Sequence, residues 1–285
     1  MVSLGYRLAP GNHVKNQLVL NSLENFERRL ARIVYTLMHH FDAKNLVSTV
    51  LSPVFTQIAL LNQNGQFEQR DAALSTLDFL VKDLDILRYS RLSAYKKIVY
   101  DLKKQIKLSL FWGYRFELHI ATLLAMKDVI FDCPDPPDFV VQGTNISIEC
   151  SSKRVNTIVC GKDYKYKIRA SLESKRKGAY NAPNSALFID ITNIIYSLKA
   201  SSFDTEPMTL SNYVEAIIPQ YNFGSVLLFG YHFEISSKKY YSSYVRVDNK
   251  IIDPSLSNFL DKHFPYDDQA GSIVVGTSMY LPIEG

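Results

Sequence analysis

The chain has 285 residues, of which 47% are hydrophobic and 21% charged, a balance typical of soluble globular proteins that excludes wholesale disorder. Its formal net charge of +4 is too small to indicate a partner by itself. The most apolar long segment, 108–126, has Arg115, Glu117 and His119 at its centre, which argues against a membrane span. Residues 1–16 contain no apolar secretory segment, and three cysteines without a CxxC spacing fit a reducing compartment. We therefore expect a cytoplasmic protein with no membrane partner.

The N-terminal part of the sequence, after an irregular arm of about fifteen residues, shows the apolar spacing of amphipathic helices. Leu30, Ile33 and Leu37, for example, recur at three and four residues. The predicted helices cover 16–40, 42–61, 68–87 and 90–105, and the second of them is either broken or begun near Pro53. We therefore expect a helical domain over residues 1–105, through which the chain would form a homodimer or join a larger complex.

Several lysines near the end of this helical region suggest two interpretations. They would either contact a polyanion or form a solvated helix face, and we favour the solvated face for all of them: Lys96, Lys97, Lys103, Lys104 and Lys107.

The next predicted helix, 106–127, is apolar on all sides, which is typical of a buried helix. Glu117 lies within it, and an unpaired buried carboxylate costs several kcal/mol or takes up a proton. Arg115 is one candidate partner, although residues two apart on a helix do not face each other. A metal ion or a lysine from an adjoining sheet is the other candidate.

A β-hairpin follows a short strand at 129–131. Its first arm is 137–141, its turn 142–145 and its second arm 146–153, and apolar and polar residues alternate along both arms. The alternation places Glu149 on the polar face of the second arm, where strand pairing would bring it close to Asp138. Two carboxylates that converge repel each other, so the hairpin suggests a divalent metal ion.

Positive charge is concentrated directly after the hairpin. Residues 153–177 contain nine Lys or Arg against Asp163 and Glu173, a local net charge of +7 that leaves about −3 for the rest of the chain. A basic helix is predicted at 164–177, followed by a strand at 185–192 that is buried on both faces although it contains Asp190. A helix at 210–219, strands at 225–233 and 241–247, and a loose tail complete the prediction. The fold class is therefore α/β, with a helical N-terminal region and then a helix, a mixed β-sheet and a helix.

The segment 106–192 resembles the core of the PD-(D/E)XK nuclease superfamily, which has the restriction-endonuclease-like fold. Pro137-Asp138 is followed after ten intervening residues by Glu149-Cys150-Ser151, within the element order of that family, and Glu117 occupies the place of its helix glutamate. The resemblance implies a nuclease-like domain over 106–285. It also implies a Mg²⁺ or Mn²⁺ site made by Asp138, Glu149, the Cys150 carbonyl and Glu117.

The sequence departs from the family at one position. Ser151 stands where the family has a lysine, which is expected to orient the attacking water and stabilise charge on the phosphate. Lys153, two residues further along the same strand face, is the first substitute to consider. Lys165 and Lys167 are alternatives, because some members of the family take the lysine from the following helix.

The resemblance implies a metal-dependent nuclease, a hydrolase of phosphodiester bonds in DNA more than in RNA, in restriction, phage defence or mobile-element processing. Asp138, Glu149, Glu117 and Lys153 would be its catalytic residues. The basic segment would bind the phosphate backbone through Lys162, Lys165, Lys167, Arg169, Lys175, Arg176 and Lys177. The alternative is an inactive nuclease-like module that binds nucleic acid or another protein. The sequence has neither a Gly-x-Ser-x-Gly elbow nor a P-loop to support other hydrolases.

Overall fold

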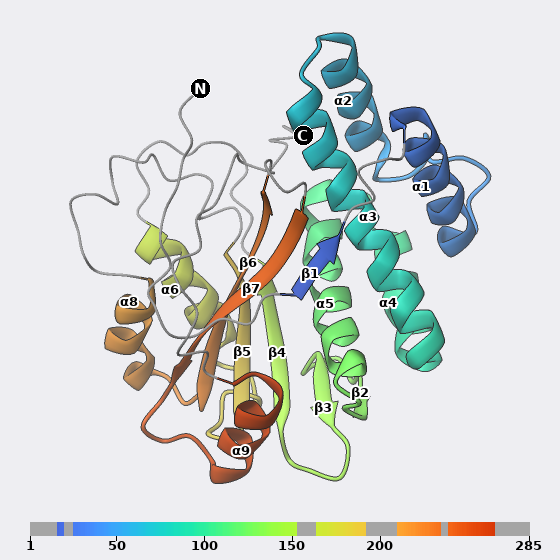
Figure 1. Cartoon of the computed structure of the whole chain (residues 1–285). Coiled ribbons are helices and arrows are strands. Elements are labelled where there is room, and N and C mark those ends of the chain that lie inside the picture. The colour runs from blue at the N-terminus through green and yellow to red at the C-terminus, as the bar shows by residue number, and fades with distance from the viewer. Residues whose placement is uncertain (1–15, 20–24, 153–163, 192–209, 235–238, 266–285) are drawn as a thin grey trace.

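The computed structural model describes residues 16–19, 25–152, 164–191, 210–234 and 239–265. Their centre is a seven-stranded mixed sheet with the order β1-β7-β6-β5-β4-β3-β2 (Figure 1). β4, β5 and β6 are parallel, and the other pairs are antiparallel. The strands are β1 (Asn16–Val19), β2 (Phe131–Asp132), β3 (Phe139–Val141), β4 (Ser147–Ser152), β5 (Ser185–Asp190), β6 (Ser225–Glu234) and β7 (Lys239–Asp248).

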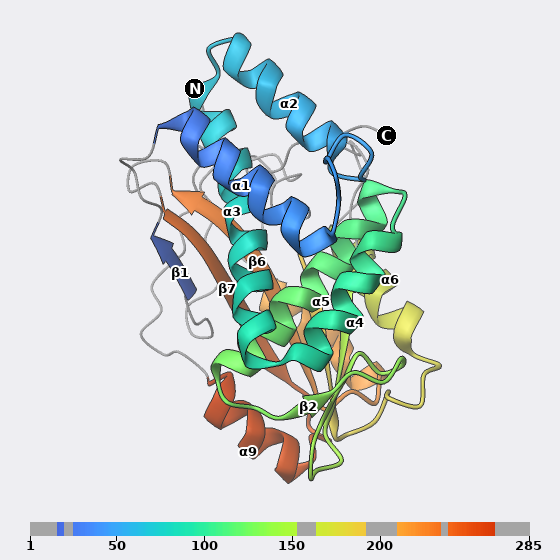
Figure 2. The same ribbon diagram turned by 90° about the vertical axis from the view of Figure 1, so that its right-hand side faces the viewer.

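Helices cover both faces of the sheet. The N-terminal helices lie on one side, and α6 and α8 lie on the other (Figure 1); α3 and α4 flank α5 (Figure 2). Their bounds are α1 (Phe26–Phe41), α2 (Ser52–Gln63), α3 (Phe67–Ser90), α4 (Leu92–Lys104), α5 (Leu108–Met126), α6 (Tyr164–Lys175), α8 (Leu210–Ile217) with a 3₁₀ turn (Ile218–Gln220), and α9 (Pro254–His263). The predicted α/β class with an N-terminal helical region is confirmed.

Each face of the sheet has its own apolar cluster. Ile148 and Cys150 of β4 pack with α1–α5, whereas Leu187 and Ile189 of β5 pack with α6 and α8. This two-sided burial follows from the alternation of side chains along a strand. The first cluster runs from the N-terminal helices into the sheet, and the division into domains 1–105 and 106–285 stays a prediction.

The start of the first helix was predicted wrongly. Residues 16–19 form β1, which pairs antiparallel with β7, and α1 begins only at Phe26. The Asn25 side chain caps α1 by accepting a hydrogen bond of 2.7 Å from the Glu27 N–H. Pairing with a distant strand thus overrides the helical spacing of the first apolar residues, because local propensity is only a weak preference.

Two other boundaries are set by local signals. The second helix begins at Ser52, beside Pro53, which is the later of the two starts that the sequence allowed, because Asp42 ends α1 in the left-handed conformation at φ 49°. Part of the predicted loose tail is the helix α9. Its signal was present in the sequence, since Asp253 caps the helix through the Ser255 N–H at 2.8 Å and Pro254 occupies the first turn.

The β3–β4 hairpin is formed as predicted. Phe139 pairs with Ile148, and Gly143 has φ +73° in the turn, a conformation that favours glycine. The hairpin is not an exposed edge, because β4 lies between β3 and β5 and is covered on both faces. Glu149 is only 2% exposed, and Ser151 is buried with it. The polar face of the second arm therefore points into the protein.

Candidate active site

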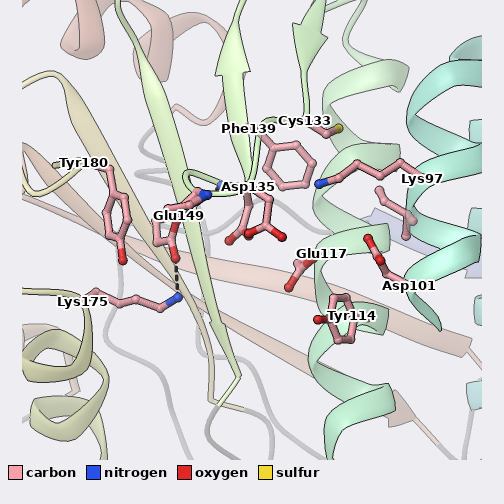
Figure 3. A pocket seen from close by; sticks show the side chains of 13 residues that line it. Lys97, Asp101, Tyr114, Glu117, Cys133, Asp135, Phe139, Glu149, Lys175 and Tyr180 are labelled. Atoms are coloured by element: carbon pink, nitrogen blue, oxygen red, sulfur yellow. Dashed lines mark hydrogen bonds and ion pairs between the residues drawn. The ribbon is translucent and has the colours of Figure 1, made fainter. Parts of the chain in front are cut away.

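A pocket of about 270 Å³ lies where α4, α5, α6 and the hairpin meet (Figure 3). The predicted residues Glu117, Asp138 and Glu149 all line it. The remaining lining comes from α4, α5, the approach to β3, and the end of α6 with the turn after it: Lys97, Ile98, Asp101, Tyr114, Cys133, Asp135, Pro136, Phe139, Lys175 and Tyr180. The pocket thus joins the predicted helical region to the hairpin.

Asp138 and Glu149 lie together, as pairing of the hairpin arms predicts. The Asp138 N–H donates a hydrogen bond of 3.3 Å to Glu149 Oε2. In the other direction, the Asp138 side chain accepts a bond of 2.6 Å from the Cys150 N–H through Oδ2. Two backbone donors therefore hold the two carboxylates in a fixed relation across β3 and β4.

Burial and mutual repulsion act on all three carboxylates. Burial, and then the charge of Glu149, raise the pKa of Asp138 to about 7. Burial, and then the charge of Asp138, raise the pKa of Glu117 well above its ordinary value. Burial also raises the pKa of Glu149. The ionised pocket is therefore short of positive charge, and it favours a proton or a cation.

Arg115 does not compensate Glu117. Its guanidinium lies 3.0 Å from Asp83 Oδ2 on α3, on the other side of α5. Of the two partners considered from the sequence, the arginine is thus wrong, as the spacing of two residues on a helix implies. Glu117 faces the pocket instead, where Lys97 of α4 and Lys175 of α6 are the cations that line the same walls.

The lysine that reaches the carboxylates is Lys175, at the end of α6. Its ammonium forms an ion pair and hydrogen bond with Glu149 Oε1 (Figure 3). Burial lowers the pKa of Lys175, but the hydrogen bond and the charge of Glu149 outweigh it, so this pKa lies above its ordinary value. Lys175 is therefore charged at neutral pH. From the sequence, Lys175 had been predicted to lie on the phosphate-binding surface.

The topology explains why the end of α6 reaches the site. β4 and β5 are parallel, so the helix between them must run back toward the start of β5. Its last turn therefore lies near the first residues of β4, where Glu149 is. Lys165, in the first turn, does not line the pocket, and its carbonyl accepts a bond of 3.0 Å from the Tyr213 hydroxyl. Lys153, Lys162 and the Lys167 side chain lie outside the described residues.

The other basic candidates lie on the outside. Arg169, Arg176 and Lys177 are exposed, as a phosphate-binding surface requires. Arg176 is partly engaged, because it lies 3.6 Å from Glu173 and over the ring of Tyr221. The basic segment therefore divides into one lysine that points into the pocket and several cations that remain on the surface.

Sequence reasoning missed the contribution of α4. Lys97 and Asp101 line the pocket, although the whole lysine run had been interpreted as a solvated face. The two residues are one helical turn apart and so share a face. That spacing alone does not show what the face meets, which depends on the packing of α4 beside α5. Tyr114 and Tyr180 were missed for the same reason.

The chemistry of the lining suits a hard divalent cation. Five carboxylates face two lysines in the lining, and oxygen donors are the ligands that Mg²⁺ and Mn²⁺ prefer. Among the described residues, however, no group of three His, Cys, Asp or Glu side chains lies close enough to hold a metal ion with the side chains as they stand. Glu117 would have to approach the Asp138–Glu149 pair.

Comparison with known proteins gives no match: no family model, no curated protein and no solved structure matches this chain. The nuclease resemblance therefore rests on the residues and on their arrangement. Within the part of the chain that is described, none of the helices has the length and apolar character needed to cross a membrane.

Proposed function

We propose that the chain is a metal-dependent nuclease with a restriction-endonuclease-like core. The observation that carries the proposal is the convergence of Glu117, Asp138 and Glu149 on one pocket, with Lys175 bound to Glu149. The order of α5, the β3–β4 hairpin, α6 and the parallel strand β5 supports the same assignment. A structural ion pair needs one lysine and one carboxylate, and this pocket gathers more carboxylates than that.

Asp138, Glu149, the Cys150 carbonyl and Glu117 would hold Mg²⁺ or Mn²⁺. A divalent ion there supplies positive charge to the phosphate oxygens and lowers the pKa of a bound water. The protein's part is to orient the carboxylates, and the charge of the bound ion would favour their ionised form against the raised pKa values. The Cys150 N–H holds the Asp138 carboxylate and the Asp138 N–H holds the Glu149 carboxylate, so neither is free to turn away.

Lys175 takes the role that Ser151 cannot fill. Its charged ammonium can donate hydrogen bonds to an attacking water and to a phosphate oxygen, in addition to Glu149. In hydrolysis the water oxygen bonds to phosphorus, one bridging P–O bond breaks, and the leaving oxygen takes up a proton. Ser151 is buried on β4 and carries no positive charge, so it offers no equivalent.

The exposed cations beside the pocket would hold the nucleic acid backbone. These contacts position the substrate without reading its sequence, and they weaken with salt. Arg169, Arg176 and Lys177 would form this surface, and the same stretch of sequence offers Lys162, Lys165 and Lys167 as further candidates. DNA in a cytoplasmic setting, such as restriction, phage defence or mobile-element processing, is the substrate we propose, and the helical region would carry homodimer or complex contacts.

The test is cleavage of end-labelled DNA and RNA with Mg²⁺ or Mn²⁺. We expect metal-dependent cleavage by the unmodified chain, loss to background in Glu149→Gln, and a fall of about 10²–10³-fold in Lys175→Met, as for other removed charge stabilisers. Glu215→Gln and Lys262→Met are matched controls on exposed positions of α8 and α9 and should keep full activity. If neither DNA nor RNA is cleaved with either metal, the proposal is contradicted.

An inactive nuclease-like module is the second candidate. Two observations favour it: Ser151 occupies the lysine position, and Lys175 already neutralises Glu149. This function predicts binding of nucleic acid that weakens with salt, survives Glu149→Gln, and fades when Arg176 and Lys177 are replaced by glutamine. Cleavage that disappears in Glu149→Gln would exclude it.

A further inference from the structure

The pocket has two side walls. Lys97 and Asp101 of α4 form one wall, and Lys175 with Tyr180 forms the opposite one, with the hairpin carboxylates between them (Figure 3). Its volume of about 270 Å³ is at the lower end of ligand sites, which run from roughly 300 to 1,000 Å³. Such a site is of a size to take a single nucleotide unit of a chain, and not a stretch of duplex.

The Tyr180 ring is positioned in the wall of the pocket by its contact with Gly178 and with an apolar cluster. The ring lies against Gly178, so closely that a Cβ built at residue 178 would be 2.2 Å from the ring Cζ. The ring also packs against the apolar cluster under α6 while remaining partly exposed toward the pocket. A glycine is therefore required here for the observed ring position. Tyr114 of α5 is a second partly exposed ring that lines the pocket, next to Glu117 (Figure 3).

We propose that this pocket takes a single-stranded or unpaired stretch of nucleic acid, with a phosphodiester between Lys97 and Lys175 and a base against Tyr180. The inference rests on the proposed nuclease function and names its substrate class. Lys97 becomes a phosphate-positioning residue, which gives the helical region a direct part in the site. Gly178 is the residue that positions the Tyr180 ring.

Two physical arguments favour a single strand. Cationic side chains that track a backbone, combined with aromatic rings on which bases stack, are the usual features of single-strand sites. A base within a duplex is stacked and paired, so it can enter a small lined pocket only if it is unpaired or turned out of the helix. The wall formed by Lys97 and Asp101 of α4 closes one side of the pocket beside the carboxylates, which also favours a single strand over the wider duplex.

The first measurement is strand preference. A fluorescein-labelled 20-nucleotide DNA, the same strand annealed to its complement, and the RNA version are compared by cleavage with Mn²⁺. We expect the single strand to be cut at least tenfold faster than the duplex. Equal rates on strand and duplex would overturn the inference and leave the nuclease proposal intact.

The second measurement isolates Tyr180 by binding, without metal, through fluorescence anisotropy. Tyr180→Leu keeps the apolar volume and removes the ring face, so we expect affinity for the single strand to fall about 5- to 100-fold, the usual range for a stacked base. Tyr180→Phe should bind as the unmodified chain does. Gly178→Ala should weaken binding in the same direction by displacing the ring. Tyr89→Leu, at an exposed tyrosine of α3, is the control.

The two proposals fail in different ways. Absence of cleavage in every substrate contradicts the nuclease proposal, while the anisotropy comparison still tests the strand preference. Equal binding of strand and duplex, or unchanged binding in Tyr180→Leu with an unchanged melting temperature, overturns the inference. Unchanged affinity in Lys97→Met would remove the phosphate role of α4.

Discussion

The two sides of α5 carry two charged clusters of opposite character. On the α3 side, Asp83 is shared by Arg115 and His119, each 3.0 Å from its Oδ2 atom, and all three are at least 95% buried. On the hairpin side, Glu117 joins Asp138 and the other carboxylates of the pocket. One cluster is closed and balanced, whereas the other is open and has too little positive charge.

The comparison favours a structural role for the Asp83 cluster and supports the catalytic role proposed for the pocket. Burial lowers the pKa of His119, so its ring is neutral and the Asp83–Arg115 pair balances alone. In the pocket, burial and repulsion raise the pKa of Asp138 to about 7. The ionised form of Asp138 therefore costs free energy in the folded state. Such arrangements are typical of functional sites.

The largest expected effect is on the closed cluster. Asp83→Asn removes the anion shared by Arg115 and His119, and breaking a buried ion pair usually costs about 3–5 kcal/mol. We expect a fall of that size in the free energy of unfolding, measured by urea denaturation at pH 7. The same change in the open cluster, Asp138→Asn, should leave stability equal or higher. A similar loss in both variants would contradict the comparison.

The next effect is on the pH dependence of stability. The folded-state pKa of Asp138, about 7, lies above its ordinary value of 3.8, so the folded state binds the proton more tightly than the unfolded state. The contribution of protonated Asp138 to the stability of the fold is complete below about pH 4 and is lost as the pH rises toward 7. At about 1.4 kcal/mol per pKa unit, the fall should be on the order of 2–4 kcal/mol.

Urea denaturation between pH 4 and 8 measures this fall. Asp138→Asn should flatten the profile, because the group that takes up the proton is gone. Glu117 and Glu149, whose pKa values are also raised, leave a smaller slope of the same sign. A profile in which stability rises with pH over this range, in the metal-free protein, would refute the assignment.

Local pattern was sufficient for the hairpin but not for the pocket. Alternation and the Gly143 turn predicted β3, β4 and the pairing of Asp138 with Glu149, because side-chain direction along a strand follows from its period of two. The site lysine depends instead on the direction in which α6 returns. Ser151 showed that a substitute was needed, and nothing in the local spacing distinguished Lys175 from Lys165.

The same limit applies to residues contributed by other elements. Lys97 looks like any exposed lysine in its own helix, and its place in the pocket depends on how α4 packs beside α5. β1 is the converse case, since residues 16–19 form a strand only because β7 offers a partner. Features that depend on long-range packing are those that the sequence alone did not predict.

A smaller effect is expected from metal binding. Mn²⁺ that binds only the folded chain stabilises it by about 2.7 kcal/mol at 100 times its Kd. We expect the rise in melting temperature to be larger at pH 8 than at pH 6, because bound carboxylates must be deprotonated. Asp83→Asn should keep the Mn²⁺ shift despite its lower stability, and Asp138→Asn should lose it. An equal shift in both variants would place the bound metal elsewhere.

The smallest effect concerns the partner that Glu117 lacks. Among the described residues, Glu117 makes neither a hydrogen bond nor an ion pair, and burial with the charge of Asp138 raises its pKa well above the ordinary value. Glu117→Gln keeps the shape and removes the repulsion, so we expect metal-free stability at pH 8 to rise by about 0.5–2 kcal/mol, the usual gain from relieving an unfavourable charge. The matched change Glu215→Gln, at an exposed position of α8, should alter stability by less than about 0.5 kcal/mol. The gain in Glu117→Gln should also vanish at pH 4, where Glu117 is already protonated in the unmodified chain, and this separates relief of repulsion from better packing. A loss of stability at pH 8 would mean that Glu117 is held by a favourable contact and belongs with the closed cluster.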